Sequence, residues 1–248
     1  MIRLAVALSL ALPAAGYAAP AHETPAQMEP VTLKAVDGVT VHGRLYASTK
    51  PKALILLFHQ AGSSKDEYAT IAPRLVKAGY SALAIDQRAG DRMFGPNLTV
   101  DGLGKSTGYL EAMPDLQAAL DWAEKRKLPV VLWGSSYSSS LIFGLAAANP
   151  DKVKALLAFS PGEYFDDKMW VRHAAAKVTV PVFITQGSEA KEIDEAKPVF
   201  DAVASADKQQ FTPEAGVHGS STLIPARNPQ GADENWRNVL MFLHEHLG

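Results

Sequence analysis

Cysteine is absent from all 248 residues of this chain. Its absence excludes a structural disulfide, a thiol nucleophile and a lipid-modified N-terminal cysteine. An excess of one charge is also missing, because 24 basic and 26 acidic residues give a net charge of -2. A chain so close to neutrality has no electrostatic reason to bind nucleic acid. No group of histidines and carboxylates has a metal-ligand spacing, so the sequence predicts no metal and no other cofactor.

The sequence also lacks a hydrophobic run long enough to span a membrane. A shorter apolar run lies at the N-terminus. A basic residue, Arg3, precedes the apolar segment Leu4 to Leu12, and small residues follow as far as Ala18. This order is typical of a secretory signal peptide, and the run is too short to span a bilayer comfortably. We therefore predict a bacterial Sec-type signal peptide over residues 1–18, with cleavage as late as residue 21, and a linker over residues 19–30. The mature protein is expected in the periplasm or outside the cell, without stable membrane insertion.

The remaining residues, 31–248, are predicted to form one α/β domain. A hairpin is expected first, with strands at 31–36 and 39–46 joined by an Asp-Gly turn. Apolar runs without alternation, such as Leu54 to Phe58, indicate strands covered on both faces of a parallel sheet. Further strands are expected at 81–85, 129–133, 155–159, 180–185 and 209–212, and helices at 66–78, 110–126, 195–206 and 234–246. Another helix is expected after the strand at 129–133 and as far as Ala148. The pattern predicts a mostly parallel twisted sheet with an N-terminal antiparallel hairpin and helices on both faces.

The strongest chemical signal is Gly134-Ser135-Ser136-Tyr137-Ser138, which follows the apolar run that begins at Val130. A strand that ends in Gly-x-Ser and continues into a helix is typical of a nucleophile elbow, in which the serine hydroxyl projects above the sheet. We therefore predict Ser136 as a nucleophile. The usual second glycine of this motif is replaced here by Ser138, which is also small.

A serine nucleophile needs a base, which in this architecture follows the serine in the chain. Four histidines do so: His173, His218, His244 and His246. The last two lie on the expected terminal helix, and His173 lies in a loosely patterned segment. His218 lies in a glycine-flanked loop after the last short strand, at the sheet edge where ligands bind in open α/β folds. His218 is therefore the predicted base.

The carboxylate that orients this base is expected between the serine and the histidine. Glu189 lies nearest the end of the strand at 180–185, where it can be held rigidly, and it is the preferred acid. Glu192 and Asp194 follow it closely and stay open as alternatives. Glu163 is a further alternative, because it lies just past the strand at 155–159.

The oxyanion of a tetrahedral intermediate needs two preorganised donors. The N–H of Tyr137, directly after the nucleophile, is the first predicted donor. The second is expected in the turn that follows Phe58, from Ala61, with Gln60 as the next choice. His59 precedes the nucleophile and is interpreted as a residue that organises this turn.

These motifs resemble those of the α/β-hydrolase superfamily over nearly the whole mature chain. Within it, Phe58-His59-Gln60-Ala61-Gly62 is similar to the His-Gly-x oxyanion turn of the dienelactone hydrolase-like branch, with Gln60 in place of glycine. Asp86-Gln87-Arg88-Ala89-Gly90 is similar to the Asp-x-Arg-Gly turn of that branch. Dienelactone hydrolases use a cysteine nucleophile, which this chain lacks, so their substrate is not carried over.

The resemblance implies a serine hydrolase of the EC 3.1.1 type that cleaves a carboxylic ester, a lactone or a related acyl bond, and the signal-peptide pattern implies that it is exported. The expected partner is a small acyl substrate, and an acyl-enzyme on Ser136 would be resolved by water that His218 activates. Two alternatives stay open: a non-catalytic binding protein with the same fold, and a transacylase or C–C hydrolase. The sequence indicates no oligomeric state.

Overall fold

The N-terminal hairpin forms one edge of the sheet in this computed structural model, which describes residues 27–248. Strand β1 (Gln27–Lys34) pairs antiparallel with β2 (Thr40–Ala47), and Gly38 turns the chain with a positive φ of 84°. Residues 27–30, predicted as linker, therefore belong to the sheet. They pair with β2 through backbone groups while their side chains are exposed, so hydrophobicity gave no signal for a strand. The predicted signal peptide lies outside the described residues.

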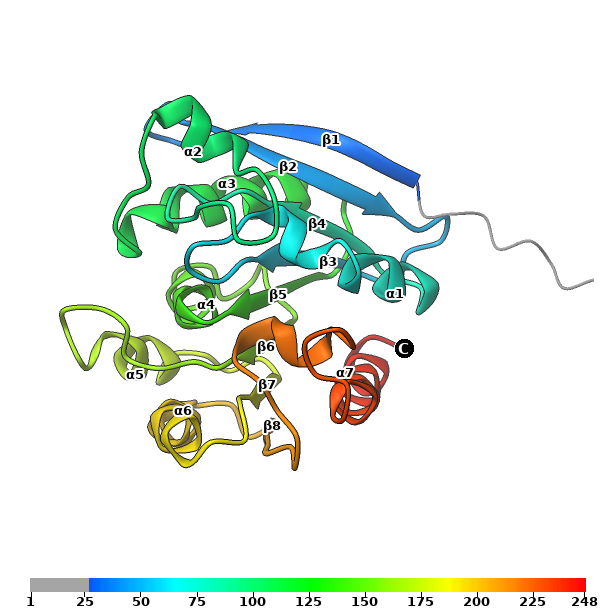
Figure 1. The fold of residues 1–248 in the computed structure, drawn as a ribbon, viewed down its shortest axis with the longest axis vertical. Coiled ribbons are helices and arrows are strands. Elements are labelled where there is room, and N and C mark those ends of the chain that lie inside the picture. Colours follow the sequence, from blue (N-terminus) through cyan, green and yellow to red (C-terminus); the bar gives the residue numbers. More distant parts are fainter. Residues whose placement is uncertain (1–26) are drawn as a thin grey trace, which may run out of the picture.

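The strands form one eight-stranded sheet in the order β1-β2-β4-β3-β5-β6-β7-β8. Figure 1 shows this order from the hairpin to β8. The pairs β1–β2 and β2–β4 are antiparallel, whereas all pairs from β4 to β8 are parallel. The remaining strands are β3 (Leu54–Phe58), β4 (Ser81–Ile85), β5 (Val130–Ser135), β6 (Ala155–Phe159), β7 (Val182–Thr185) and β8 (Lys208–Phe211). The predicted fold class is confirmed, and the buried runs without alternation are the parallel strands covered on both faces.

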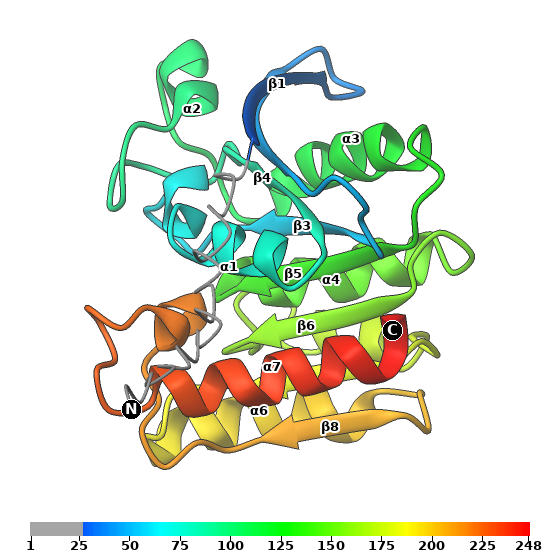
Figure 2. The ribbon, with the colours of Figure 1, turned by 90° about the vertical axis from the view of Figure 1, so that its right-hand side faces the viewer.

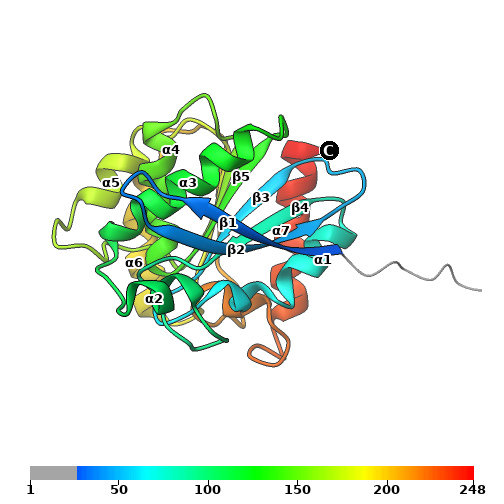
Figure 3. The same ribbon diagram turned by 90° about the horizontal axis from the view of Figure 1, so that it is seen from above.

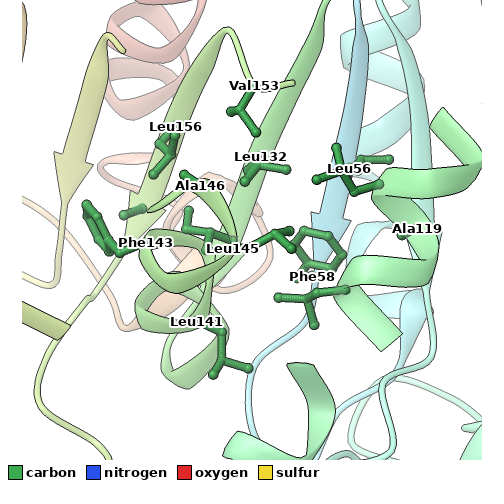
Figure 4. Packing of buried hydrophobic residues seen from close by; sticks show 14 of the residues in the cluster. Leu56, Phe58, Ala119, Leu132, Leu141, Phe143, Leu145, Ala146, Val153 and Leu156 are labelled. Atoms are coloured by element: carbon green, nitrogen blue, oxygen red, sulfur yellow. The ribbon is translucent and has the colours of Figure 1, made fainter. Parts of the chain in front are cut away.

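Helices cover both faces of the sheet (Figure 3). On one face lie α3 (Met113–Glu124), α4 (Tyr137–Ala148), α5 (Trp170–Ala175) and α6 (Ala190–Ala202), and on the other lie α1 (Ile71–Lys77) and α7 (Ala232–Leu247). Each layer has its own apolar cluster, because alternate side chains of a strand point to opposite faces. Leu56 and Phe58 pack toward α3 and α4, as Figure 4 shows, whereas Ile55 and Leu57 belong to the cluster with α1 and α7.

Short helices complete the chain and were not expected as separate elements. They are α2 (Leu98–Leu103) and the 3-10 helices η1 (Lys65–Tyr68), η2 (Leu110–Ala112) and η3 (Gly219–Leu223). Helix α5 was not expected either, because six residues contain too few turns for a clear period. Helix α6 begins at Ala190, five residues before the predicted start, and this earlier start places Glu192 in its first turn.

The carboxyl ends of the parallel strands meet at one edge, toward which the arrowheads of β5 and β6 point in Figure 2. The segments that follow β3, β4, β5, β6 and β7 therefore converge there, together with the loop before α7. Open α/β sheets bind ligands outside this edge. Among residues 27–248, no helix is long and apolar enough to cross a membrane.

Candidate active site

Ser136 lies in a sharp turn between β5 and α4. Its backbone has φ 58° and ψ -126°, a conformation that L residues other than glycine rarely adopt. Strain of this kind is typical of a nucleophile elbow. A Cβ at Gly134 would overlap the backbone of Ser139, so the entry of the turn has room only for glycine. The local sequence thus folds as the motif predicts.

Ser138, at the place of the usual second glycine, has a structural part in this turn. Its hydroxyl oxygen accepts a hydrogen bond from the Ser135 N–H at 2.9 Å and lies 2.7 Å from the carbonyl oxygen of Phe58, to which it donates. The serine therefore joins the elbow to the end of β3. The small side chain is tolerated, and its hydroxyl satisfies buried backbone groups that glycine could not reach.

The structure brings Ser136 and His218 together across 82 residues of sequence. His218 Nε2 lies 2.8 Å from Ser136 Oγ, and His218 Nδ1 lies 2.9 Å from Glu192 Oε1. Ser136 is 6% exposed, whereas the His218 side chain is 42% exposed. A hydroxyl, an imidazole and a carboxylate in this order have the geometry needed to move a proton from the hydroxyl.

The carboxylate that contacts His218 is Glu192 and not Glu189, the preferred acid of the sequence analysis. Glu189 is exposed and is the residue before helix α6, whereas Glu192 lies in the first turn of the helix and folds back over the strand end. Glu192 Oε2 accepts hydrogen bonds from the Gly187 N–H at 2.8 Å and from the Ser160 hydroxyl at 2.7 Å. The misplaced helix start explains the preference for Glu189.

The other two alternatives have different surroundings. Glu163 accepts hydrogen bonds from the backbone N–H groups of Val171 and Arg172 and forms a 3.0 Å ion pair with Arg172, so it caps helix α5. Asp194 is exposed and lines a cavity of about 270 Å³ beside Tyr164. Neither residue is paired with His218. Glu195 also lines this cavity.

Ser160 and Gly187 support the acid and were missed by the sequence analysis. Ser160 has a positive φ of 57°, and its hydroxyl oxygen also accepts a hydrogen bond from the Gly219 N–H at 2.9 Å. Ser160 therefore connects the Glu192 carboxylate with the loop that carries His218. The position of Ser160 directly after a buried strand was the available signal.

The pKa values of the acid and the base move in opposite directions. Partial burial alone would raise the pKa of Glu192, but hydrogen bonds from His218, Ser160 and Gly187 outweigh it and lower the pKa to about 2. The hydrogen bond to Glu192 raises the pKa of His218 above its ordinary value, against the effect of partial burial. The pair is therefore arranged to stabilise an imidazolium next to a carboxylate.

The turn after β3 is held from inside by His59. Burial lowers the pKa of His59 to about 4, which keeps the ring neutral. His59 Nε2 accepts a hydrogen bond from the Gln87 N–H at 2.9 Å, so the proton is on Nδ1, which donates to the Gln60 carbonyl oxygen at 2.8 Å. C=O and N–H of one peptide unit point in opposite directions. Fixing the Gln60 carbonyl therefore also fixes the N–H of Ala61.

The backbone N–H groups of Gln60 and Ala61, the two predicted oxyanion donors from this turn, differ in whether they already donate a hydrogen bond. The Gln60 N–H donates to Glu67 Oε2 at 2.8 Å, so it is already used. Within residues 27–248, no hydrogen bond uses the N–H of Ala61. Tyr137 is the first residue of α4, where N–H groups have no partner inside the helix. Ala61 and Tyr137 are thus the better pair of candidate donors.

Metal ligands are not gathered at this site. In the part of the chain from residue 27 to residue 248, no group of three or more His, Asp or Glu side chains is arranged to hold a metal ion. The chemistry available here is that of the serine, the imidazole, the carboxylate and the backbone N–H groups.

Comparison with known proteins identifies relatives of this arrangement. The sequence pattern of the family described as serine aminopeptidase, S33, matches residues 49–174, about half of the chain. A dienelactone hydrolase from Anabaena variabilis has 17% sequence identity and a TM-score of 0.71, covering 91% of this chain and 100% of its own. An esterase from Pyrococcus furiosus has 18% identity and a TM-score of 0.70, covering 90% of this chain and 94% of its own.

A cold-adapted esterase from an Arctic intertidal metagenomic library has 23% identity and a TM-score of 0.69. The similarity covers 92% of this chain and 97% of the esterase. At these identities, the three structures establish the shared fold. No significant match to a curated protein sequence was found.

Proposed function

Because this chain belongs to the serine aminopeptidase S33 family of α/β hydrolases, we propose that it is a serine hydrolase with Ser136 as nucleophile. The observation that carries the proposal is the hydrogen-bonded series Ser136–His218–Glu192, with successive distances of 2.8 and 2.9 Å. The favoured substrate is a small carboxylic ester, a lactone or a related acyl compound. Export to the periplasm or the medium is part of the proposal and is supported by the signal-peptide pattern at residues 1–18.

In the first half of the reaction, Ser136 Oγ attacks the carbonyl carbon while its proton passes to His218 Nε2. Glu192 accepts the Nδ1–H of the ring, so it stabilises the imidazolium that forms. The N–H groups of Tyr137 and Ala61 bind the oxyanion of the tetrahedral intermediate. Collapse of the intermediate leaves an acyl group on Ser136, and the departing alkoxide takes the proton from His218.

The second half repeats these steps with water as nucleophile. His218 takes a proton from water, the resulting hydroxide attacks the acyl carbon, and the acid leaves with Ser136 protonated again. The reaction as a whole consumes water and needs no cofactor, since every proton taken by His218 is returned in the next step.

A peptide or amide with a free amino group is a second candidate substrate. The family description, serine aminopeptidase, favours it. The cavity of about 270 Å³ next to Tyr164 is lined by Glu163, Asp194 and Glu195, which would attract an ammonium group. Glu163 is already paired with Arg172, and Glu195 lies 3.8 Å from Lys191 Nζ. Asp194, which has no ion pair within residues 27–248, is therefore the carboxylate best placed to bind such a group.

A fluorophosphonate probe tests the nucleophile without a choice of substrate. We expect mass spectrometry of the mature protein to find one phosphonylated residue, Ser136, and no label in Ser136→Ala or His218→Ala. A folded protein without label would contradict the hydrolase proposal and favour a binding protein with this fold. Hydrolysis of p-nitrophenyl acetate, compared with that of an amino acid p-nitroanilide, then separates the ester and amide candidates.

A further inference from the structure

A second carboxylate, Glu67, lies beneath the candidate active site and has no part in the proton transfer described above. It belongs to η1, within the charged run Lys65-Asp66-Glu67-Tyr68, and yet it is fully buried. A buried carboxylate is costly unless several donors satisfy it.

Two donors from different elements converge on Glu67. Oε2 accepts the backbone N–H of Gln60 at 2.8 Å, and Oε1 accepts the hydroxyl of Ser135 at 2.7 Å. Gln60 precedes the candidate oxyanion donor Ala61, and Ser135 precedes the candidate nucleophile Ser136. One carboxylate thus joins the turn after β3 to the nucleophile elbow.

The same contact continues to the loop of the candidate base. The Ser135 hydroxyl oxygen accepts a hydrogen bond from the Ser220 N–H at 2.8 Å, two residues after His218. Gly219, with φ 63°, passes so close that a Cβ there would lie 2.5 Å from Ser135 Oγ. The three backbone segments that carry the oxyanion donor, the nucleophile and the base therefore meet around Glu67 and Ser135.

We propose that Glu67 is a positioning residue that holds the oxyanion turn in register with the nucleophile elbow. The Gln60 N–H is held by Glu67 and the Gln60 carbonyl by His59, so both sides of this residue are fixed. Because the Gln60 carbonyl and the Ala61 N–H belong to one peptide unit, the orientation of the Ala61 N–H is then fixed as well. An oxyanion donor is effective when it is aimed before the reaction begins, because no energy is then spent on reorganisation during the step.

The ionised form of Glu67 fits these contacts, because both partners donate to it. Burial raises the pKa of Glu67 to about 7, against the hydrogen bonds from Gln60, Ser135 and Ser63, so the carboxylate forms near neutral pH. If Glu67 were protonated on Oε1, its hydrogen and that of the Ser135 hydroxyl would face each other. The Ser135 hydroxyl would then have to turn away from Glu67. The contacts are therefore complete only above this pH.

Three titratable side chains act on Glu67 from the elements packed around it. Tyr68 lies on η1 and Tyr137 on α4, and burial raises both of their pKa values well above the ordinary range, so both stay neutral. His218 lies in the loop before η3, and the Glu67 charge contributes to the raised pKa of the imidazole. The charge of each of these two groups therefore affects the pKa of the other, lowering that of Glu67 and raising that of His218.

The test is the rate at which a fluorophosphonate labels Ser136, measured from pH 5 to 9. In this reaction Ser136 Oγ bonds to phosphorus, fluoride leaves, and the phosphoryl oxygen occupies the oxyanion position while the proton passes to His218. We compare wild type with Glu67→Gln and with the control Glu245→Gln, which changes an exposed glutamate on α7. Thermal melting checks that each variant is folded.

We expect Glu67→Gln to be labelled about tenfold more slowly than wild type at pH 8, less than the loss from removing an oxyanion donor outright. Its labelling rate should also rise with pH at a lower midpoint and less steeply, because only His218 then titrates. Glu245→Gln should match wild type in both respects. An unchanged rate and midpoint in folded Glu67→Gln would overturn the proposal, since a purely structural residue would change the melting temperature alone.

The inference rests on the proposed function, but the two fail separately. If wild type is not labelled, the proposal that Ser136 is a nucleophile is refuted. If wild type is labelled and Glu67→Gln is labelled at the same rate, only the positioning role of Glu67 is refuted. If Glu67→Gln does not fold, Ser135→Ala removes the hydroxyl that joins Glu67 to the Ser220 N–H and leaves the backbone intact. This variant should be labelled about three- to tenfold more slowly than wild type. Such a loss is expected when a charge-assisted hydrogen bond is removed that affects the reaction only through the positions of neighbouring residues. A wild-type rate in that variant would likewise overturn the proposal.

Discussion

The two sides of the candidate active site contain carboxylates in opposite environments. On the acid side, Glu192 accepts hydrogen bonds from His218, Ser160 and Gly187, its side chain is 20% exposed, and its pKa is lowered to about 2. On the oxyanion side, Glu67 is fully buried and its pKa is raised to about 7. Contact with solvent and the neighbouring imidazole therefore separate the two groups.

The difference shows how a single reaction centre can use one residue type for two purposes. A carboxylate that must stay charged beside an imidazole needs several donors and some access to water. A carboxylate that fixes backbone segments can be fully enclosed, at the cost of ionising with difficulty. The carboxylate of the acid side accordingly keeps some contact with water, whereas that of the oxyanion side has none.

The largest effect is expected on the acid side, from Glu192→Gln. Gly187 and Ser160 both donate to Oε2, so the amide oxygen must occupy that place and the NH₂ group must face His218. His218 Nδ1 would then have to accept, which puts the ring proton on Nε2, toward Ser136. We expect kcat for p-nitrophenyl acetate to fall by about 10³- to 10⁴-fold, as for the wrong tautomer in other serine hydrolases.

Glu189→Gln is the matched control for this prediction, because it makes the same chemical change three residues earlier in the chain. Glu189 is exposed and is not paired with His218, so its kcat should equal that of wild type. A large loss in Glu189→Gln, together with an active Glu192→Gln, would reverse the assignment of the acid.

A pair of glycine substitutions compares the packing of the two sides. On the oxyanion side, a Cβ at Gly90 would overlap the Ser63 carbonyl oxygen, the His59 ring and the Asn97 side chain. Part of that overlap is with backbone, which cannot move away cheaply, so Gly90→Ala should lower the free energy of unfolding by about 3 kcal/mol. On the acid side, a Cβ at Gly187 would lie 2.9 Å from Glu192 Cδ, at the end of a flexible side chain.

Gly187→Ala should therefore cost less than about 1 kcal/mol of stability, because the Glu192 side chain can turn away. The displaced carboxylate would orient His218 less well, and we expect kcat to fall about tenfold. Urea denaturation and ester hydrolysis measure the two quantities. Equal losses of stability in both variants would show that the two sides are packed alike.

The sequence predicted the parts of this site that follow from strand ends and chain order. Ser136 and His218 were found because a buried run ended in Gly-x-Ser and one histidine followed the last strand in a glycine-flanked loop. The structure places their side chains in contact, and their catalytic roles remain predictions. A mostly parallel sheet was predicted because uninterrupted apolar strands alternate with helical segments, and the resemblance of the motifs then implied the α/β-hydrolase fold.

The remaining parts depend on details that the pattern did not contain. The choice between Glu189 and Glu192 depends on where helix α6 begins, and a shift of one turn changes which carboxylate reaches the histidine. Glu67 gave no signal at all, because a glutamate in a charged run is typical of an exposed helix start. Glu67 is buried in contact with Gln60 and Ser135. Gln60 contacts it only through its backbone N–H, and Ser135 lies 68 residues away in the sequence.

The stability of the protein as a function of pH tests the oxyanion side. The pKa of Glu67 is raised in the folded protein from 4.5 to about 7, so the folded state holds its proton more tightly than the unfolded state. Between these values the unfolded chain loses the proton first, and ionisation of Glu67 therefore lowers the free energy of unfolding as the pH rises. Below pH 4.5 both states are protonated and the effect is absent.

Glu67→Gln removes this penalty, so the stability of the variant relative to wild type should increase between pH 5 and pH 8, by on the order of 2 kcal/mol. The lost charge also lowers the pKa of His218 in the folded protein, which acts in the same direction. Urea denaturation at both pH values measures the change, with Glu245→Gln as the variant whose difference should stay constant. If the difference in the free energy of unfolding between Glu67→Gln and wild type is also the same at both pH values, Glu67 ionises as easily in the folded protein as in the unfolded chain. Glu67 and Glu192 would then differ in position and not in pKa.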